Sequence, residues 1–131
     1  MMKAILALFA ALSFAATANA DDKLNCENPT ANVEIGQCTV LGFEKADKEL
    51  NMIWPKMKAA AQDSDTENDN HKNIDALLAS QRTWLAFLEA ECAWQALHQM
   101  QGGSGGPIVY WGCKTDLTKQ RIKQLQSGAS Q

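Results

Sequence analysis

Apolar residues recur at steps of three and four along two long stretches of the chain. The first stretch runs from Val33 to Ala61, and its spacing predicts an amphipathic helix with one buried face. That face is formed by Val33, Cys38, Leu41, Phe43, Ala46, Leu50, Ile53, Trp54 and Met57. Thr30 or Asn32 is the expected N-cap. Pro55 removes a backbone donor inside the pattern, so we expect a kink just before it.

The second stretch, Ile74 to Met100, has the most regular helical spacing in the chain. Its expected buried stripe comprises Ile74, Leu77, Leu78, Gln81, Trp84, Leu85, Leu88, Cys92, Ala96 and Met100. Asn70 or Asn73 can cap its start, and the loop Gly102–Pro107 ends it. Pro107 fits the first turn of a third helix, on which Cys113, Leu117, Arg121 and Leu125 share one face.

These patterns contain no strand signal, so we predict an all-α bundle of three main helices, a long hairpin followed by a C-terminal helix. The segment Gln62–Asn70 is polar and aperiodic, and we interpret it as a solvated connecting turn. Its alternating acidic residues resemble a calcium loop of the EF-hand type. Asn68 and Ile74 stand where that loop needs Gly and a bidentate Glu, which disfavours calcium binding.

The first twenty residues have the pattern of an export signal. Lys3 precedes an apolar run, and Ala18 and Ala20 flank Asn19 as in an A-x-A cleavage site. We predict cleavage after Ala20, which leaves one domain, residues 21–131, with no membrane anchor and a periplasmic or secreted location. Loss of Lys3 changes the charge from 12 − 15 = −3 to 11 − 15 = −4. An acidic chain without a Lys/Arg cluster is a poor nucleic-acid binder.

Four cysteines, Cys26, Cys38, Cys92 and Cys113, remain in the exported chain, an even number that fits two disulfides. We prefer the local pairs Cys26–Cys38 and Cys92–Cys113, which close loops of 11 and 20 intervening residues. Each closure stabilises the fold by roughly 3 kcal/mol in the loop-entropy account. Cys38–Cys92 with Cys26–Cys113 stays open, because sequence alone does not choose among connectivities.

Motifs for catalysis are missing from the sequence. His71 and His98 belong to no metal-binding arrangement, and no CxxC or GxSxG motif occurs. Glu89 and Glu91 lie two residues apart, on different faces of a helix, and do not form a natural acid/base pair. We therefore expect no enzymatic activity, no catalytic residues, no metal and no cofactor.

Several large or polar side chains admit both a structural and a binding interpretation. We assign Trp54 and Trp84 to the core, whereas Trp94 falls off the main stripe and can be a surface contact. Gln81 and Arg121 lie on apolar stripes. We expect them to form a hydrogen bond or salt bridge between helices, for example to a carboxylate such as that of Glu89 or Glu91.

Three segments resemble the small secreted LprI-type lysozyme-inhibitor domain. They are Cys26–Trp54, Ser80–Cys92 (SQRTWLAFLEAEC) and Cys113–Leu125 (CKTDLTKQRIKQL). The residues that carry the likeness, to which we assign structural roles, are Leu50, Asn51, Trp54, Gln81, Trp84, Leu117, Thr118, Arg121 and Leu125. The chain departs from the family at Pro55 and at residues 89–91, where the family commonly has an Arg-Asp pair before the cysteine.

The resemblance implies an exported, disulfide-bonded, all-helical module that binds a protein, with a lysozyme as the candidate partner. The expected contact residues are Gly103, Ser104, Gly105, Trp94 and Trp111, grouped around the glycine loop. The alternative is a structural or accessory envelope protein that packs on another exported protein. That alternative predicts an exposed apolar patch around Trp94, Leu97 and Trp111, larger than a monomer normally tolerates.

Overall fold

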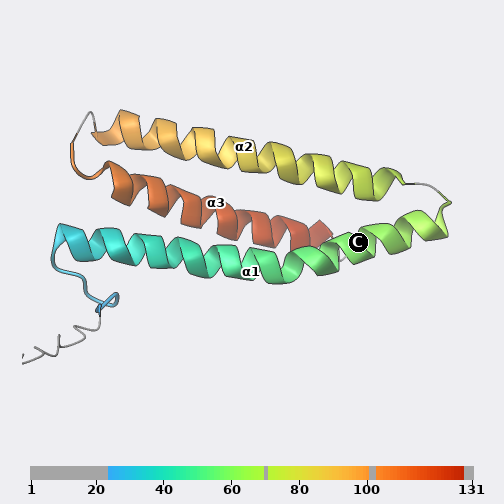
Figure 1. Ribbon diagram of the computed structural model, residues 1–131, viewed down its shortest axis with the longest axis horizontal. Coiled ribbons are helices and arrows are strands. Elements are labelled where there is room, and N and C mark those ends of the chain that lie inside the picture. Colours follow the sequence, from blue (N-terminus) through green and yellow to red (C-terminus); the bar gives the residue numbers. More distant parts are fainter. Residues whose placement is uncertain (1–23, 70, 101–102, 129–131) are drawn as a thin grey trace, which may run out of the picture.

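The computed structural model describes residues 24–69, 71–100 and 103–128, and these residues form three helices and no strand. Helix α1 spans Asn32–Glu67, α2 spans Lys72–Met100 and α3 spans Gly106–Gly128. Figure 1 shows α2 running antiparallel to α1 and α3, with α3 ending short of the α1–α2 turn. α3 contacts each of the other helices more extensively than they contact one another. The predicted all-α, three-helix architecture is confirmed.

Helix α1 is longer than the apolar pattern predicted. It continues to Glu67, so the expected turn at 62–70 is wrong for its first six residues. The helix runs through Pro55 without interruption, and its axis changes direction in its second half (Figure 1). The N-cap is Ala31, neither Thr30 nor Asn32. Ala31 has no side-chain oxygen to cap the helix, but the Glu34 carboxylate accepts the N–H groups of Thr30 (2.9 Å) and Ala31 (3.2 Å), which is one half of a capping box.

The start of α2 is capped by a side chain of α1. Asp65 is buried, and its carboxylate oxygens accept the backbone N–H groups of Asn73 and Ile74, both at 2.9 Å. Asn73 lies inside the helix and is not its N-cap, while Asn70 falls outside the described residues. The chain reverses between the helices at Asp69, whose φ of 50° lies in the left-handed region. The polar turn is thus held by a buried carboxylate, which the interpretation as a solvated turn missed.

The core lies where α3 packs into the hairpin. Leu50, Ile122 and Leu125 are buried together, and Ile53, Trp54, Met57, Leu77 and Trp84 pack against them. Toward the other end, Ala46, Leu88 and Cys92 are also buried. The predicted core positions Val33, Leu41 and Leu85 are instead exposed. Val33 and Leu41 lie about 140° around the helix from Ala46, too far to reach the buried face.

Both preferred disulfides are confirmed, and the alternative connectivity is wrong. Cys26–Cys38 ties the segment before α1 to the second turn of that helix, with Cα atoms 5.4 Å apart. Cys92–Cys113 joins α2 to α3, with Cα atoms 5.5 Å apart. Cys92 is completely buried, so this second disulfide is part of the core. Both covalent links therefore lie in the half of the bundle that carries the α2–α3 turn.

The predicted signal peptide, residues 1–20, lies outside the described residues. Of the three described helices, none combines the length and apolar character needed to cross a membrane.

Candidate protein-binding site

Gly103, Ser104 and Gly105, which we call the glycine turn, are the described residues between α2 and α3. The N–H of Gly103 donates to the carbonyl of Met100 at 2.6 Å, and α3 starts at Gly106. A side chain at Gly105 would place its Cβ 2.2 Å from the Met100 Cε, so the flexible end of Met100 would have to move aside. Gly103 and Ser104 are exposed, and Gly105 is half-buried. Two of the three predicted contact positions in the turn are therefore accessible to a partner.

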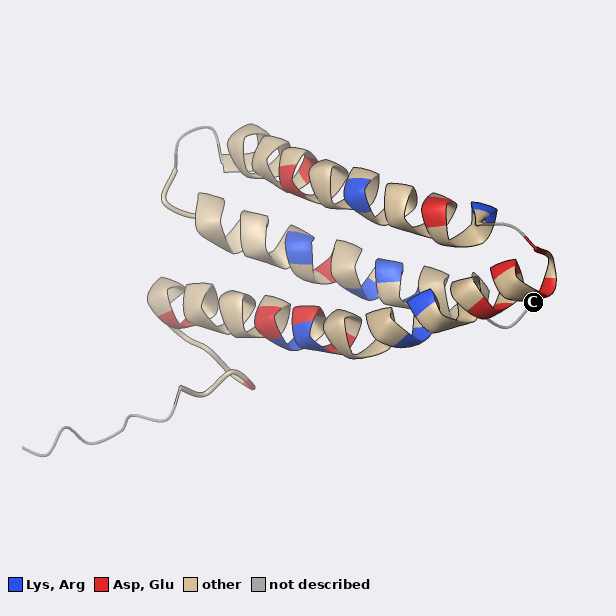
Figure 2. Ribbon diagram, turned by 45° about the vertical axis from the view of Figure 1, so that its right-hand side comes forward, with Lys and Arg blue, Asp and Glu red and all other residues tan. Residues whose placement is uncertain are grey.

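A cleft of about 440 Å³ opens beside the glycine turn. It lies between the start of α1, the end of α2 and the start of α3, and its walls are mainly apolar. The lining residues are Asn32, Val33, Gly36, Met100, Ser104, Gly105, Pro107, Ile108 and Val109. Residues 92–113 carry no Lys, Arg, Asp or Glu, so the turn and the flanking ends of α2 and α3 have no acidic or basic side chain of these types, while Glu34 lies in the first turn of α1 at the same end. Figure 2 shows these ends of α2 and α3 in tan, opposite the acidic α1–α2 turn.

The two tryptophans predicted to contact a partner differ in their exposure to solvent. Trp94 projects from α2 with 57% of its surface exposed, and its ring stacks on His98 with 5.3 Å between centroids. Trp111 is half-buried between α3 and α1, where its ring lies 5.3 Å from that of Phe43. Trp94 is available to a partner as it stands. Trp111 offers only an edge, because its other side already packs against α1.

A buried lysine beside Trp111 is enclosed by aromatic rings. The Nζ of Lys114 lies 4.5 Å from the ring centroid of Phe43, 5.2 Å from that of Tyr110 and 5.1 Å from that of Trp111. It also forms a 2.6 Å salt bridge with Glu89 of α2. The negative faces of the rings and the carboxylate together compensate the buried ammonium. This cluster joins all three helices next to Cys92–Cys113.

The electrostatics of the cluster follow from its hydrogen bonds. The bond from Lys114, with a second from the Tyr110 hydroxyl, lowers the pKa of Glu89 below its usual value. The bond to Glu89 raises the pKa of Tyr110, with burial as a further cause. Each group is thus held in its ordinary charge state at neutral pH. The arrangement fixes α2 against α3 and presents no free base or nucleophile.

Sequence reasoning missed this cluster but found its polar counterpart further along the helices. Arg121 donates from Nε to Gln81 Oε1 at 3.0 Å, which confirms the predicted interhelical hydrogen bond. Its second partner is the Ser80 hydroxyl at 2.9 Å, and its guanidinium lies 5.8 Å from the Trp84 ring. The suggested carboxylate partners are wrong, because Glu89 binds Lys114 and Glu91 accepts from Gln95. Burial lowers the pKa of Arg121.

The remaining residues behind the family likeness line the same helix interfaces. Leu50 and Leu125 are in the core, and Trp54 packs against it. Leu117 is half-buried, and Asn51 is exposed and donates to Asp47 at 2.8 Å. Thr118 is fully buried, and its hydroxyl has no hydrogen-bond partner in the described part of the chain. Apart from Asn51, these positions build the bundle and are not a surface patch.

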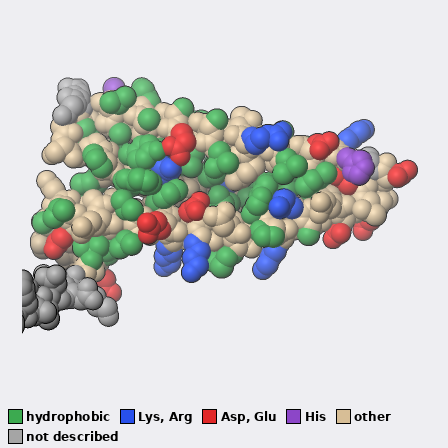
Figure 3. All heavy atoms as spheres, in the orientation of Figure 1, with side chains coloured by type: hydrophobic (Ala, Val, Ile, Leu, Met, Phe, Trp, Pro, Cys, Tyr) green, Lys and Arg blue, Asp and Glu red, His purple; other side chains and the backbone are tan. Residues whose placement is uncertain are grey.

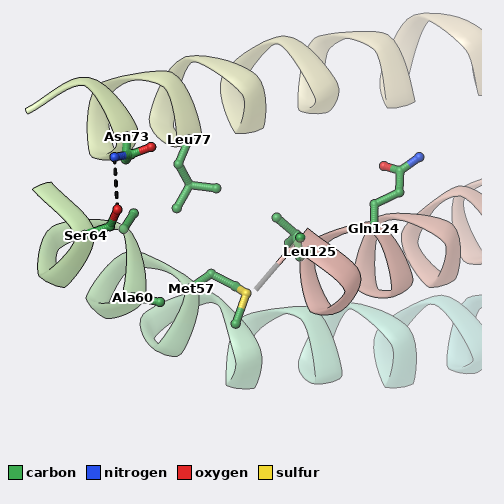
Figure 4. A pocket seen from close by; sticks show the side chains of 9 residues that line it. Met57, Ala60, Ser64, Asn73, Leu77, Gln124 and Leu125 are labelled. Carbon is green, nitrogen blue, oxygen red and sulfur yellow. Dashed lines mark hydrogen bonds between the residues drawn. The ribbon is translucent and has the colours of Figure 1, made fainter. Parts of the chain in front are cut away.

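The opposite end of the molecule holds two shallow clefts. One, of about 430 Å³, lies beyond the end of α3, and Figure 4 shows Met57 and Leu125 facing one another there. The same view shows Asn73 bonded to Ser64 across the hairpin, at 3.2 Å. The other, of about 480 Å³, lies beside Asp65 and His71. Among the described residues, no three His, Cys, Asp or Glu side chains are arranged to hold a metal ion.

These features define a small, disulfide-linked helical module with an uncharged turn and an exposed aromatic side chain at one end. The sequence profile described as "Lysozyme inhibitor LprI" matches residues 26–125, and the chain belongs to that family. An uncharacterised protein of Rhizobium meliloti (strain 1021) is 29% identical, with 96% of this chain and 94% of the relative covered. No solved structure matches the chain significantly.

Membership of this family agrees with two broader conclusions from the sequence. The family is named for inhibition of an enzyme and not for catalysis, which is consistent with a chain that acts by binding. Two disulfides are typical of proteins that fold outside the cytoplasm, so the chain is extracytoplasmic.

Proposed function

We propose that this chain is an exported protein-binding module that inhibits a lysozyme. The match to the lysozyme-inhibitor family over residues 26–125 carries the proposal, because it spans both disulfides and all three helices. Export through residues 1–20, with cleavage after Ala20, is part of the same proposal. Intact-mass measurement of the exported protein tests it, since cleavage there leaves a chain that begins at Asp21.

The glycine turn is the proposed contact element. It lies at one end of the bundle, between two helices that Cys92–Cys113 joins, and Gly103 and Ser104 are exposed. A narrow turn without charged side chains can enter an enzyme cleft without burying an unpaired charge. Trp94 and the edge of Trp111 are the proposed flanking contacts. The net charge of −4 on residues 21–131 favours approach to a basic lysozyme, most strongly at low salt.

A lysis assay tests the proposal directly. The oxidised, exported chain is mixed with several lysozymes, and the clearing of a cell-wall suspension is followed. We expect inhibition of at least one lysozyme. Undiminished lysis by every enzyme at a large molar excess of the chain would refute the proposed function.

Two sets of variants locate the contact. Ser104→Arg places a bulky cation on the turn and should abolish inhibition of a basic lysozyme, whereas Ala59→Arg on the exposed side of α1 should not. The double variant Asp63→Lys with Glu67→Lys reverses charge at the opposite end. Loss of inhibition in this double variant alone would place the contact at the acidic end.

One observation favours a second candidate function. Phe87, Trp94 and Leu97 on α2 are 50%, 57% and 75% exposed, as expected for a module that packs on another exported protein. Trp111, which was expected in the same patch, is half-buried instead. A pull-down from an envelope extract distinguishes the candidates, because it recovers a lysozyme in the first case and a different envelope protein in the second.

A further inference from the structure

Helix α2 has a second apolar face that no other part of the described chain covers. The first face packs on α1 and α3 through Leu88 and Cys92. The second, which we call the outer face of α2, points away from both helices and is exposed at every position. It consists of Ala76, Ala79, Thr83, Ala86, Ala90, Ala93 and Leu97, with Phe87 and Trp94 beside them. Figure 3 shows small hydrophobic side chains scattered along the upper edge, which α2 forms, and larger groups of them between the helices.

The spacing of the outer face is that of a coiled-coil seam. Its seven main positions alternate steps of three and four over three heptads, and none carries a charged side chain. A helix that is apolar on two opposite faces is typical of one with partners on both sides. The alanines allow a second helix to approach closely, and the larger Phe87, Trp94 and Leu97 supply apolar area at its margin.

We propose that the outer face of α2 binds the same face of a second copy of this chain, in antiparallel orientation. The charges that flank the seam favour this occupant. Arg82 and Glu89 occupy equivalent heptad positions on one margin, and positions of that type meet in an antiparallel pair. With Arg82 opposite Glu89 of the second copy, Thr83 faces Ala86 and Ala79 faces Ala90 of that copy. The two-fold axis then generates both ion pairs.

The groups needed for this arrangement are accessible. The Glu89 side chain is 57% exposed although it binds Lys114, so its carboxylate can accept a further donor from outside. Arg82 is exposed, and the parallel arrangement would give neither charge an opposite partner. Antiparallel packing also aligns the two helix dipoles favourably.

The area available is that of a small specific interface. Covering a half-exposed aromatic side chain removes on the order of 100 Å² from water. The three large side chains and five alanines of two copies together bury about 1,000 Å², the lower limit for a specific interface. The resulting dimer keeps the two glycine turns at opposite ends but covers Trp94, so only the turn and Trp111 would be left for the contact with lysozyme proposed above. The test below needs no lysozyme, so its failure is distinguishable from failure of the proposed function.

Sedimentation of the oxidised, exported chain over a range of concentrations tests the proposal. We expect a reversible monomer–dimer equilibrium that approaches twice the monomer mass at about 100 μM. Ala90→Glu buries a charge in the seam and should leave the protein monomeric over the whole range. The matched variant Ala59→Glu, on an exposed position of α1, should still dimerise. Circular dichroism and thermal unfolding verify that both variants fold.

A charge reversal tests the orientation. Arg82→Glu places like charges across the seam at two symmetric positions and should raise the dissociation constant about tenfold at low salt. Lys119→Glu, an equal charge change on exposed α3, should leave it unchanged. A monomer at every concentration, or a dimer indifferent to Ala90→Glu, would overturn the proposal. A dimer sensitive to Ala90→Glu but not to Arg82→Glu would overturn the antiparallel register.

Discussion

The two ends of the bundle are closed by different chemistry. At the end that carries the glycine turn, Cys92–Cys113 and the caged Lys114 hold the helices together, Cys26–Cys38 ties the N-terminal segment to α1, and residues 92–113 carry no Lys, Arg, Asp or Glu. At the other end, the α1–α2 turn is acidic and is held by the Asp65 carboxylate on the N–H groups of α2. The disulfides are unaffected by acid but are broken by reduction. The hydrogen bonds to Asp65 are insensitive to reduction but weaken when the carboxylate is protonated.

Removal of the disulfide between α2 and α3 should have the largest effect on stability. We expect Cys92→Ala with Cys113→Ala to lower the free energy of unfolding by about 3 kcal/mol, measured by urea denaturation. Cys26→Ala with Cys38→Ala should cost less, because that disulfide ties an extended segment to α1 and joins no two helices. An equal or greater loss in the second pair would show that the N-terminal segment contributes more than its contacts indicate.

Loss of the buried cap should have the next largest effect. Asp65→Ala leaves the N–H groups of Asn73 and Ile74 without their acceptor, and we expect the melting temperature to fall by about 5 °C. The neighbouring exposed carboxylate provides the control, since Asp63→Ala removes the same charge without a cap. Similar melting temperatures for the two variants would contradict the structural role of Asp65.

Acid should loosen the end that is held by Asp65. Burial raises the pKa of Asp65, but hydrogen bonds from Ile74 and Asn73 together lower it by more. The pKa therefore lies below the usual value near 3.8. A carboxylate with a lowered pKa stabilises the fold above its unfolded-state pKa, and this contribution disappears as the pH falls through the folded-state value. Stability should therefore be level above about pH 5 and decline below about pH 4. The decline should be smaller in Asp65→Ala, as followed by thermal unfolding at each pH.

The smallest effect is expected at the start of α1. Hydrogen bonds from Thr30 and Ala31 lower the pKa of Glu34, which shows that its ionised form is favoured there. Glu34→Ala removes the acceptor for both N–H groups and should lower the melting temperature by about 2 °C. Glu49→Ala, at an exposed position in the middle of the same helix, should change it by less.

The same contrast between the ends explains which features the sequence could reveal. Apolar periodicity found α2 almost to the residue, because Leu77, Leu88 and Cys92 form a regular buried stripe. Apolar periodicity missed the last six residues of α1, because they are polar on all sides. Asp65, which lies among them, is instead in contact with the next helix. The spacing of Gln81 and Arg121 indicated a polar bridge between helices. Lys114 gave no such signal, since its cage combines a ring of α1, a carboxylate of α2 and two rings of its own helix.

The shortness of α3 divides the hairpin into a three-helix body and a two-helix arm. Beyond Gly128, no described residue of α3 lies against α1 and α2, and the cleft lined by Met57 and Leu77 opens there. Both disulfides lie in the body, so the arm can fray while the body stays folded. Proteases would accordingly cut this chain first near the acidic turn. Because neither disulfide joins α1 to α2 or α3, packing alone would then hold α1 in the body.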